Sequence, residues 1–143
     1  MLIEQLSIFV ENKPGRLAEI TKMLEENNID IRALSIADTR DFGIMRLIVN
    51  NPAKAEKVFK DAGCTVSLTN VIAIGVEDKP GGLASAMEIL FQNHISVEYM
   101  YAFISRTDET AFVILRVEDN ESALKALDKN GVRILKSSEI YEM

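Results

Sequence analysis

The stretch that decides the fold is Glu11-Asn12-Lys13-Pro14-Gly15-Arg16-Leu17-Ala18. It returns 66 positions later as Glu77-Asp78-Lys79-Pro80-Gly81-Gly82-Leu83-Ala84, with six of the eight residues unchanged. In each copy an apolar run typical of a strand precedes the Pro-Gly pair, and apolar residues at helical spacing follow it. A strand–turn–helix unit that occurs twice at a constant spacing indicates that the chain is a duplication.

Working outward from the first turn, the sequence predicts the order β-α-β-β-α-β. The expected strands lie at 2–11, 29–37, 44–49 and 64–68, and the helices begin near Pro14 and Pro52. We expect the Asn12 side chain to accept from free N–H groups at the first helix start, and Pro14 to lie in the first helical turn. Asn28 and Gly63 suit the left-handed ends of the two helices.

The second half repeats this order. Its expected strands are 71–76, 95–104, 110–117 and 132–135, the last resumed near Ile140, and its expected helices are 80–92 and 120–129. The seam at 67–70 has no Gly/Pro/Ser linker, so we expect the two halves to pack tightly. The predicted fold class is therefore α+β, with one domain at 1–68 and the other at 69–143.

A split β-α-β pair forms a four-stranded antiparallel sheet with both helices on one face. Several strands, such as 44–49 and 97–104, are apolar on both sides. Helices on one side only would leave the other apolar face in water, so that face needs a cover. We expect a sheet from a second chain to supply it, which predicts a homodimer through sheet faces or edges.

Composition argues against several classes of function. The net charge is −6 with Lys and Arg scattered, whereas a nucleic-acid surface needs clustered positive charge. The N-terminus has no basic region followed by an apolar core, and no uncharged apolar run approaches the ~20 residues that cross a bilayer. Cys64 is the only cysteine, so no disulfide framework is expected. The expectation is a soluble cytoplasmic protein.

The two turns are the best binding candidates. A strand that ends in a Pro-Gly turn and opens a helix aims unpaired N–H groups at one spot, and the helix dipole adds partial positive charge there. Such a spot suits a carboxylate, and Asn12 or Asp78 beside it suits an ammonium group. An α-amino acid carries both charges on one carbon. The alternative is that each turn only starts a helix.

The chain resembles the ACT domain family, small regulatory modules that bind amino acids. The likeness rests on the β-α-β-β-α-β order, on Glu-Asn-Lys-Pro-Gly-Arg-Leu at 11–17 and on Asn-Ile-Asp-Ile at 28–31, and it covers the chain twice. It implies two tandem ferredoxin-like domains whose sheets join side by side into one eight-stranded sheet with the helices on one face. It also implies effector amino acids at the domain interface, between the first turn of one domain and the second strand of the other.

Carried over by position, the resemblance implies sixteen ligand-binding residues. In the first copy these are Asn12, Lys13, Pro14, Gly15, Arg16, Leu17, Asp30 and Ala37, and in the second Asp78, Lys79, Pro80, Gly81, Gly82, Leu83, Ser96 and Tyr101. The copies differ, with Asp78 for Asn12, Gly82 for Arg16 and Ser96 for Asp30. We therefore expect the first turn, facing the strand at 99–103, to be the principal site, and the second turn, facing 35–38, to follow.

Other residues carry less chemistry. His94 has no second His or Cys near it in the pattern, so no metal site is expected, and Cys64 is expected in the core. The aromatic row from Tyr99 to Phe103 resembles base-stacking residues of RNA-binding sheets but lacks flanking basic residues. No nucleophile–base set and no phosphate-binding Gly loop followed by Lys occurs. We therefore expect neither an enzyme nor a cofactor.

The leading hypothesis is a non-catalytic sensor or regulatory protein that binds an amino acid between its two domains. The alternative is an interaction module without a ligand that docks a partner metabolic enzyme. A third, weaker hypothesis is a nucleic-acid binder of the same fold class.

Overall fold

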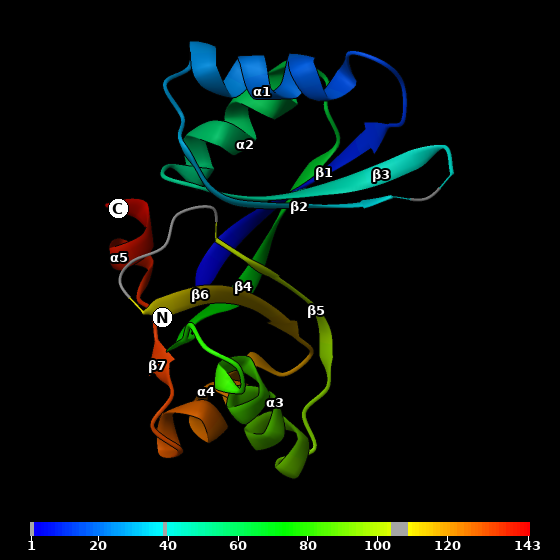
Figure 1. The fold of residues 1–143 in the computed structure, drawn as a ribbon. Coiled ribbons are helices and arrows are strands. Elements are labelled where there is room, and N and C mark those ends of the chain that lie inside the picture. The colour runs from blue at the N-terminus through cyan, green and yellow to red at the C-terminus, as the bar shows by residue number, and fades with distance from the viewer. Residues whose placement is uncertain (1, 39, 104–108) are drawn as a thin grey trace. The chain divides into compact units, whose positions relative to one another are not determined.

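The computed structural model describes residues 2–38, 40–103 and 109–143 (Figure 1). The elements, in chain order, are β1 Ile3–Glu11, α1 Arg16–Glu26, β2 Ile31–Asp38, β3 Phe42–Val49, α2 Pro52–Asp61, β4 Val66–Glu77, α3 Gly82–Gln92, β5 Val97–Ala102, β6 Thr110–Val117, α4 Asn120–Lys129, β7 Arg133–Ile134 and α5 Ser137–Tyr141. The order β-α-β-β-α-β occurs twice, with β4 ending the first repeat and beginning the second. The predicted α+β class with tandem ferredoxin-like repeats is confirmed.

Strand β4 is continuous across the boundary between the repeats. The sequence predicts separate strands at 64–68 and 71–76, whereas the structure has one strand of 12 residues. No Gly or Pro interrupts the backbone there, so one extended segment serves both repeats. The described residues therefore form seven strands rather than the expected eight.

The chain divides into two compact units. One consists of Glu4–Thr69 with Tyr141–Met143, and the other of Asn70–Ile140 with the N-terminal residues through Ile3. The prediction that a closing strand resumes near Ile140 is wrong, because this residue lies in the short helix α5 and is buried. The expected strand at 132–135 is only β7, which pairs with β4.

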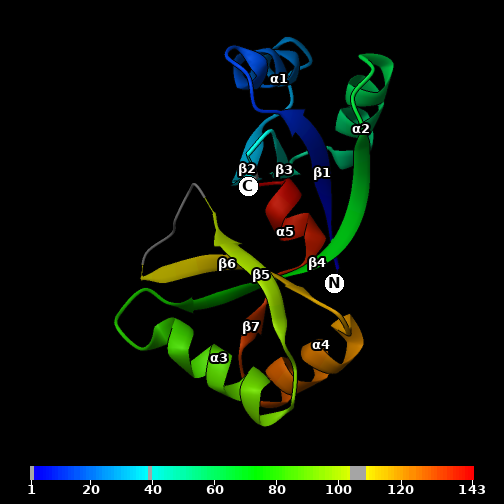
Figure 2. The same cartoon turned by 90° about the vertical axis from the view of Figure 1, so that its right-hand side faces the viewer.

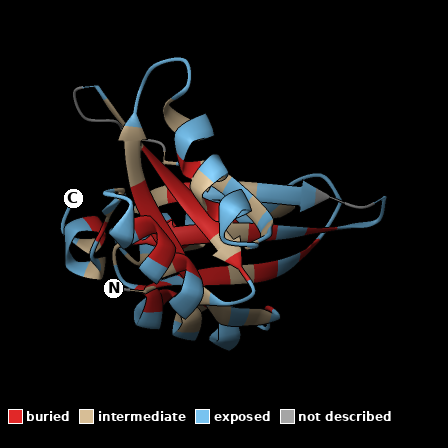
Figure 3. Ribbon diagram, turned by 90° about the horizontal axis from the view of Figure 1, so that it is seen from below, coloured by how far each residue is buried: buried red, intermediate tan, exposed pale blue. Residues whose placement is uncertain are grey.

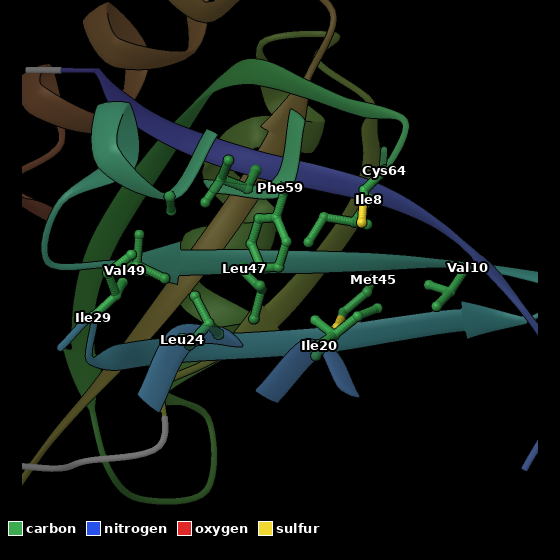
Figure 4. Packing of buried hydrophobic residues seen from close by; sticks show 12 residues of the cluster. Ile8, Val10, Ile20, Leu24, Ile29, Met45, Leu47, Val49, Phe59 and Cys64 are labelled. Carbon is green, nitrogen blue, oxygen red and sulfur yellow. The ribbon is translucent and has the colours of Figure 1, made fainter. Parts of the chain in front are cut away.

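In the N-terminal unit the strand order is β2-β3-β1-β4. Antiparallel pairing sets Leu6 opposite Leu47 and Ile8 opposite Met45, so these side chains share one face of the sheet. Helices α1 and α2 pack on that face through buried residues that include Ile20, Leu24, Ala55 and Phe59 (Figures 1 and 4). Cys64 is buried in the same cluster, as expected.

The C-terminal unit repeats this packing. Strand β4 lies between β6 and β7, and β5 pairs with the other edge of β6. Helices α3 and α4 lie on one face (Figure 2), where they bury a second core made of Ile72, Ile74, Ala86, Leu90, Val113, Leu115, Val117, Ala123 and Leu127. Within each unit, both helices therefore cover a single face of the sheet.

All four long helices end in the same way. A residue with positive φ follows each of them, namely Asn28 (55°), Gly63 (83°), His94 (59°) and Gly131 (76°). In α1 the next N–H, from Ile29, donates to the carbonyl of Leu24 at 2.9 Å, and the other three ends make the corresponding bond. The predicted ends at Asn28 and Gly63 are confirmed, and His94 has a backbone role.

Part of the sheet in the N-terminal unit exposes apolar side chains on the face away from its helices. Phe9, Phe42 and Ile44 are 46%, 43% and 39% exposed, and the two phenyl rings lie 4.9 Å apart. In Figure 3 the strands are buried over their central parts and exposed toward some of their ends. We call these three residues the open patch.

Candidate functional site

The first turn connects β1 to α1 through a fixed pattern of backbone hydrogen bonds. The N–H of Asn12 donates to the carbonyl of Asp41 (2.9 Å), that of Lys13 to Glu11 (3.0 Å) and that of Arg16 to Lys13 (3.3 Å). Gly15 precedes the helix with φ of 86°, in the left-handed region that glycine adopts without steric cost. The helix thus begins at Arg16, two residues later than predicted.

The second turn has the same backbone pattern. The N–H of Asp78 donates to Glu109 (2.8 Å), that of Lys79 to Glu77 (2.9 Å) and that of Gly82 to Lys79 (3.0 Å). Gly81 has φ of 91° and precedes α3. The repeated sequence therefore specifies a repeated conformation, although Asp78 replaces Asn12 and Gly82 replaces Arg16 in the second turn.

Neither turn uses a side chain to cap its helix. The prediction that Asn12 accepts from the helix start is wrong, because its Nδ2 instead donates to the carbonyl of Arg40 at 3.3 Å. Pro14 lies before the helix rather than in its first turn, because the left-handed Gly15 intervenes.

Three N–H groups at each helix start make no hydrogen bond within the part of the chain that the structure describes. They belong to Gly15, Leu17 and Ala18 in the first repeat, and to Gly81, Leu83 and Ala84 in the second. Unpaired N–H groups at the positive end of a helix attract an oxygen anion. The local geometry of both turns is therefore suited to a carboxylate.

A pocket of about 80 Å³ lies beside the first turn, inside the N-terminal unit. Its walls are Val10, Leu17, Ile36 and Gly43, and its polar rim is Glu11, Asn12 and Lys13. The carboxylate of Glu11 and the ammonium of Lys13 are 3.3 Å apart and both well exposed. The pocket thus combines an aliphatic wall with one charge of each sign.

Three of the sixteen predicted residues, Asn12, Lys13 and Leu17, line this pocket. Arg16 is directed elsewhere, with one guanidinium nitrogen 2.9 Å from Glu19 and the other 3.7 Å from Sγ of Cys64. The hydrogen bond to Glu19 raises the pKa of Arg16, against the opposing effect of burial. The guanidinium of Arg16 therefore contacts Glu19 of its own helix and the buried Cys64, and it does not line the pocket.

Hollows beside the second turn are larger and more polar. One of about 520 Å³ is lined by Glu77, Asp78, Lys79, Glu109 and Thr110, and another of about 460 Å³ reaches Gly81 and Gly82. Lys79 pairs with Glu77 at 2.5 Å, and this hydrogen bond raises the pKa of Lys79. The two turns share a backbone but not a chemical environment.

Four predicted residues, Asp30, Ala37, Ser96 and Tyr101, are not among the described residues that line the hollows beside the turns. Asp30 follows α1, whose 11 residues separate it from the first turn by about 16 Å at 1.5 Å per residue. Its carboxylate pairs with Arg32 at 2.5 Å, and that guanidinium also donates to the carbonyl of Tyr141. Ser96 lines a separate hollow after α3. Ala37 is exposed near the end of β2, and Tyr101 stacks on Tyr99 in β5.

Sequence reasoning missed four residues of the first pocket, namely Val10, Glu11, Ile36 and Gly43. Strand register brings them together, since Val10 pairs with Gly43 and Ile36 pairs with the next inward residue of β3, Met45. The alternation of apolar residues in β1 and β2 shows which side chains share a face. It does not show which of them lie beside the turn.

Residues 2–38, 40–103 and 109–143 hold no group of three or more His, Cys, Asp or Glu side chains that could hold a metal ion. Within the same ranges no helix is long and apolar enough to cross a membrane.

Comparison with known protein families shows to which family the chain belongs. The family model for an ACT domain pair matches residues 1–143. The chain belongs to the ACT domain pair family. ACT domains are regulatory modules, so this chain has a tandem regulatory fold.

Solved structures support the assignment. The chain is 38% identical to protein BT0572 from Bacteroides thetaiotaomicron, with a TM-score of 0.94, covering 100% of this chain and 98% of that one. It shares the fold of the aspartate kinase regulatory subunit from Thermus thermophilus in its ligand-free form, at 17% identity and a TM-score of 0.63, covering 88% and 90% of the chains. The regulatory subunit from Thermus flavus gives 16% identity and a TM-score of 0.61, covering 90% and 93%. No curated protein matches the chain.

Proposed function

We propose that this ACT domain pair is a non-catalytic regulatory protein that senses a free amino acid at its strand–helix turns. The repeats at 1–68 and 69–143 each supply one turn. The observation that carries the proposal is the set of three unpaired N–H groups at the first helix start, beside a pocket with one carboxylate and one ammonium. An amino acid offers the matching carboxylate, ammonium and side chain at a single carbon.

The sixteen residues carried over from the family form the proposed contact set, with the first turn as the principal site. Asn12, Lys13 and Leu17 have the strongest support because they line the same pocket. Asp30 and Ser96, each one residue before β2 or β5, and Ala37 and Tyr101, within those strands, remain part of the proposal. The proposal further describes a cytoplasmic homodimer, in keeping with the lone buried cysteine and the open patch.

A thermal-shift screen of the twenty amino acids at millimolar concentration tests the proposal. A ligand at 100 times its dissociation constant adds about 2.7 kcal/mol to the free energy of unfolding, which raises the melting temperature of the full chain measurably. Gly15→Ala is the informative variant, because a Cβ at Gly15 meets nothing within 4 Å and the left-handed alanine costs only roughly 1–2 kcal/mol. We expect it to remain folded and to lose the shift. No shift with any amino acid would contradict the proposal.

The second candidate is a ligand-free module that docks a partner enzyme. The open patch favours it, because contiguous exposed phenylalanine and isoleucine side chains mark interaction surfaces. In that case no amino acid shifts the melting temperature, and substitution of Gly15 leaves partner binding unchanged.

A further inference from the structure

The pocket beside the first turn is small and aliphatic. Its volume of about 80 Å³ is several times the ~10–15 Å³ at which a cavity holds one water on the same measure. The walls come from β1, α1, β2 and β3, and the four described wall residues are all aliphatic or glycine. The described walls therefore offer apolar contact and no charged partner to a ligand side chain.

Two of the wall residues are large, apolar and exposed. Leu17 is 45% and Ile36 43% exposed, although both belong to a single pocket. An apolar group placed between them would remove surface from water on both sides, and this removal favours binding in proportion to the area covered. A polar or charged side chain in the same position would lose hydration without gaining a partner from the walls.

The polar rim fixes which end of a ligand points outward. Lys13 presents an ammonium and Glu11 a carboxylate, and the N–H of Leu17 is one of the unpaired groups. A zwitterion can place its carboxylate toward Lys13 and this N–H, and its ammonium toward Glu11. The side chain of an α-amino acid held in this way enters the aliphatic part of the pocket.

The second repeat provides an internal comparison. Ala102 is the counterpart of Ile36, since Ile36 pairs with Met45 and Ala102 with Val113. Ala111 is the counterpart of Gly43, since Gly43 pairs with Val10 and Ala111 with Val76. The hollow there is about 520 Å³ and is lined by three acidic residues, a lysine and a threonine. Among the described residues, the aliphatic lining therefore belongs to the first turn and not to the second.

We propose that the first-repeat site selects an amino acid with an aliphatic side chain and rejects charged ones. This inference rests on the proposed function and names the ligand class of the same site. Ile36 and Leu17 are its specificity-determining residues, and the second turn does not share the preference.

Isothermal titration calorimetry on the full chain tests the inference, with valine, leucine and isoleucine compared with lysine and aspartate. We expect the aliphatic three to bind at least tenfold more tightly than the others. Ile36→Ala removes three carbons from the wall and is expected to weaken aliphatic binding about tenfold. Leu34→Ala is the matched control, because Leu34 is on the same strand and 36% exposed but does not line the pocket.

The outcomes separate the inference from the proposed function. Tight binding of lysine or aspartate, with weak aliphatic binding, overturns the inference and leaves the sensor proposal standing. Equal effects of Ile36→Ala and Leu34→Ala also overturn it. Absence of binding by every amino acid contradicts both. If Ile36→Ala does not fold, Leu17→Ala on the exposed helix surface replaces it, with the same expected loss.

Discussion

At the scale of single residues, the two turns show how one backbone accepts different side chains. Gly15 and Gly81 share a left-handed conformation, and a Cβ at either position meets nothing within 4 Å. Gly82 is different, because a Cβ there would lie 2.0 Å from the carbonyl oxygen of Glu77. The first repeat has Arg16 at this position, so the second turn closes more tightly onto the end of its strand.

Gly82→Ala is therefore expected to destabilise the protein more than Gly81→Ala. In the Gly81 variant the added Cβ meets no other atom, so the free energy of unfolding falls only by the cost of a left-handed alanine, roughly 1–2 kcal/mol. The Gly82 variant forces the backbone of β4 or α3 to shift. Urea unfolding of both variants measures the difference, and equal midpoints would show that the close approach has no energetic consequence.

At the scale of elements, helix boundaries follow local chemistry where a side chain can act on its own backbone. Helix α2 begins after Asn51, whose side chain accepts from the N–H of Lys54, and α4 begins after Asp119. Helices α1 and α3 lack such caps and leave their N–H groups open. The uncapped pair is the pair that follows the copied turns.

The cap at Asp119 gives a pH-dependent prediction. Hydrogen bonds from the hydroxyl and N–H of Ser122 lower the pKa of Asp119 below its ordinary value. A lowered folded pKa contributes stability that is present above the unfolded value of about 3.9 and is lost as pH falls through the folded value. Asp119→Ala should therefore lower the urea midpoint at pH 7 and have little effect near pH 2.

Asp128→Ala is the matched control for this prediction, because Asp128 is exposed in the same helix but lies in its last turn. It should not reduce the midpoint, since a carboxylate at the negative end of a helix does not stabilise it. A loss of stability that is the same for Asp119→Ala at both pH values would contradict the assigned cause.

The sequence predicts the repeated fold well because its determinants are local. Alternating apolar residues define the strands, and Asn28 and Gly63 mark helix ends by their own backbone preferences. The role of Asn12 was predicted wrongly because its side-chain amide donates to the carbonyl of Arg40, in the loop between β2 and β3. The local sequence pattern does not show that this loop lies beside the first turn. Ile36 was missed as a pocket wall because only strand register brings it beside the turn.

At the scale of the whole molecule, the duplication gives one chain two copies of a turn with a conserved backbone and diverged surroundings. The ACT domain pair family accounts for the architecture over all 143 residues. Unequal pockets beside the two turns would let one chain hold a selective site and a second site with a different ligand or none. A ligand can then regulate the protein only through a difference in affinity between two of its states.

The most direct test of the central claim is a two-dimensional 15N–1H NMR titration of the full chain with the tightest-binding amino acid. The account predicts that the amide resonances of Gly15, Leu17 and Ala18 shift most, because their free N–H groups receive the ligand carboxylate. Gly81, Leu83 and Ala84 serve as the internal comparison in the second repeat. Saturable binding that leaves the amides of Gly15, Leu17 and Ala18 unmoved would contradict this claim.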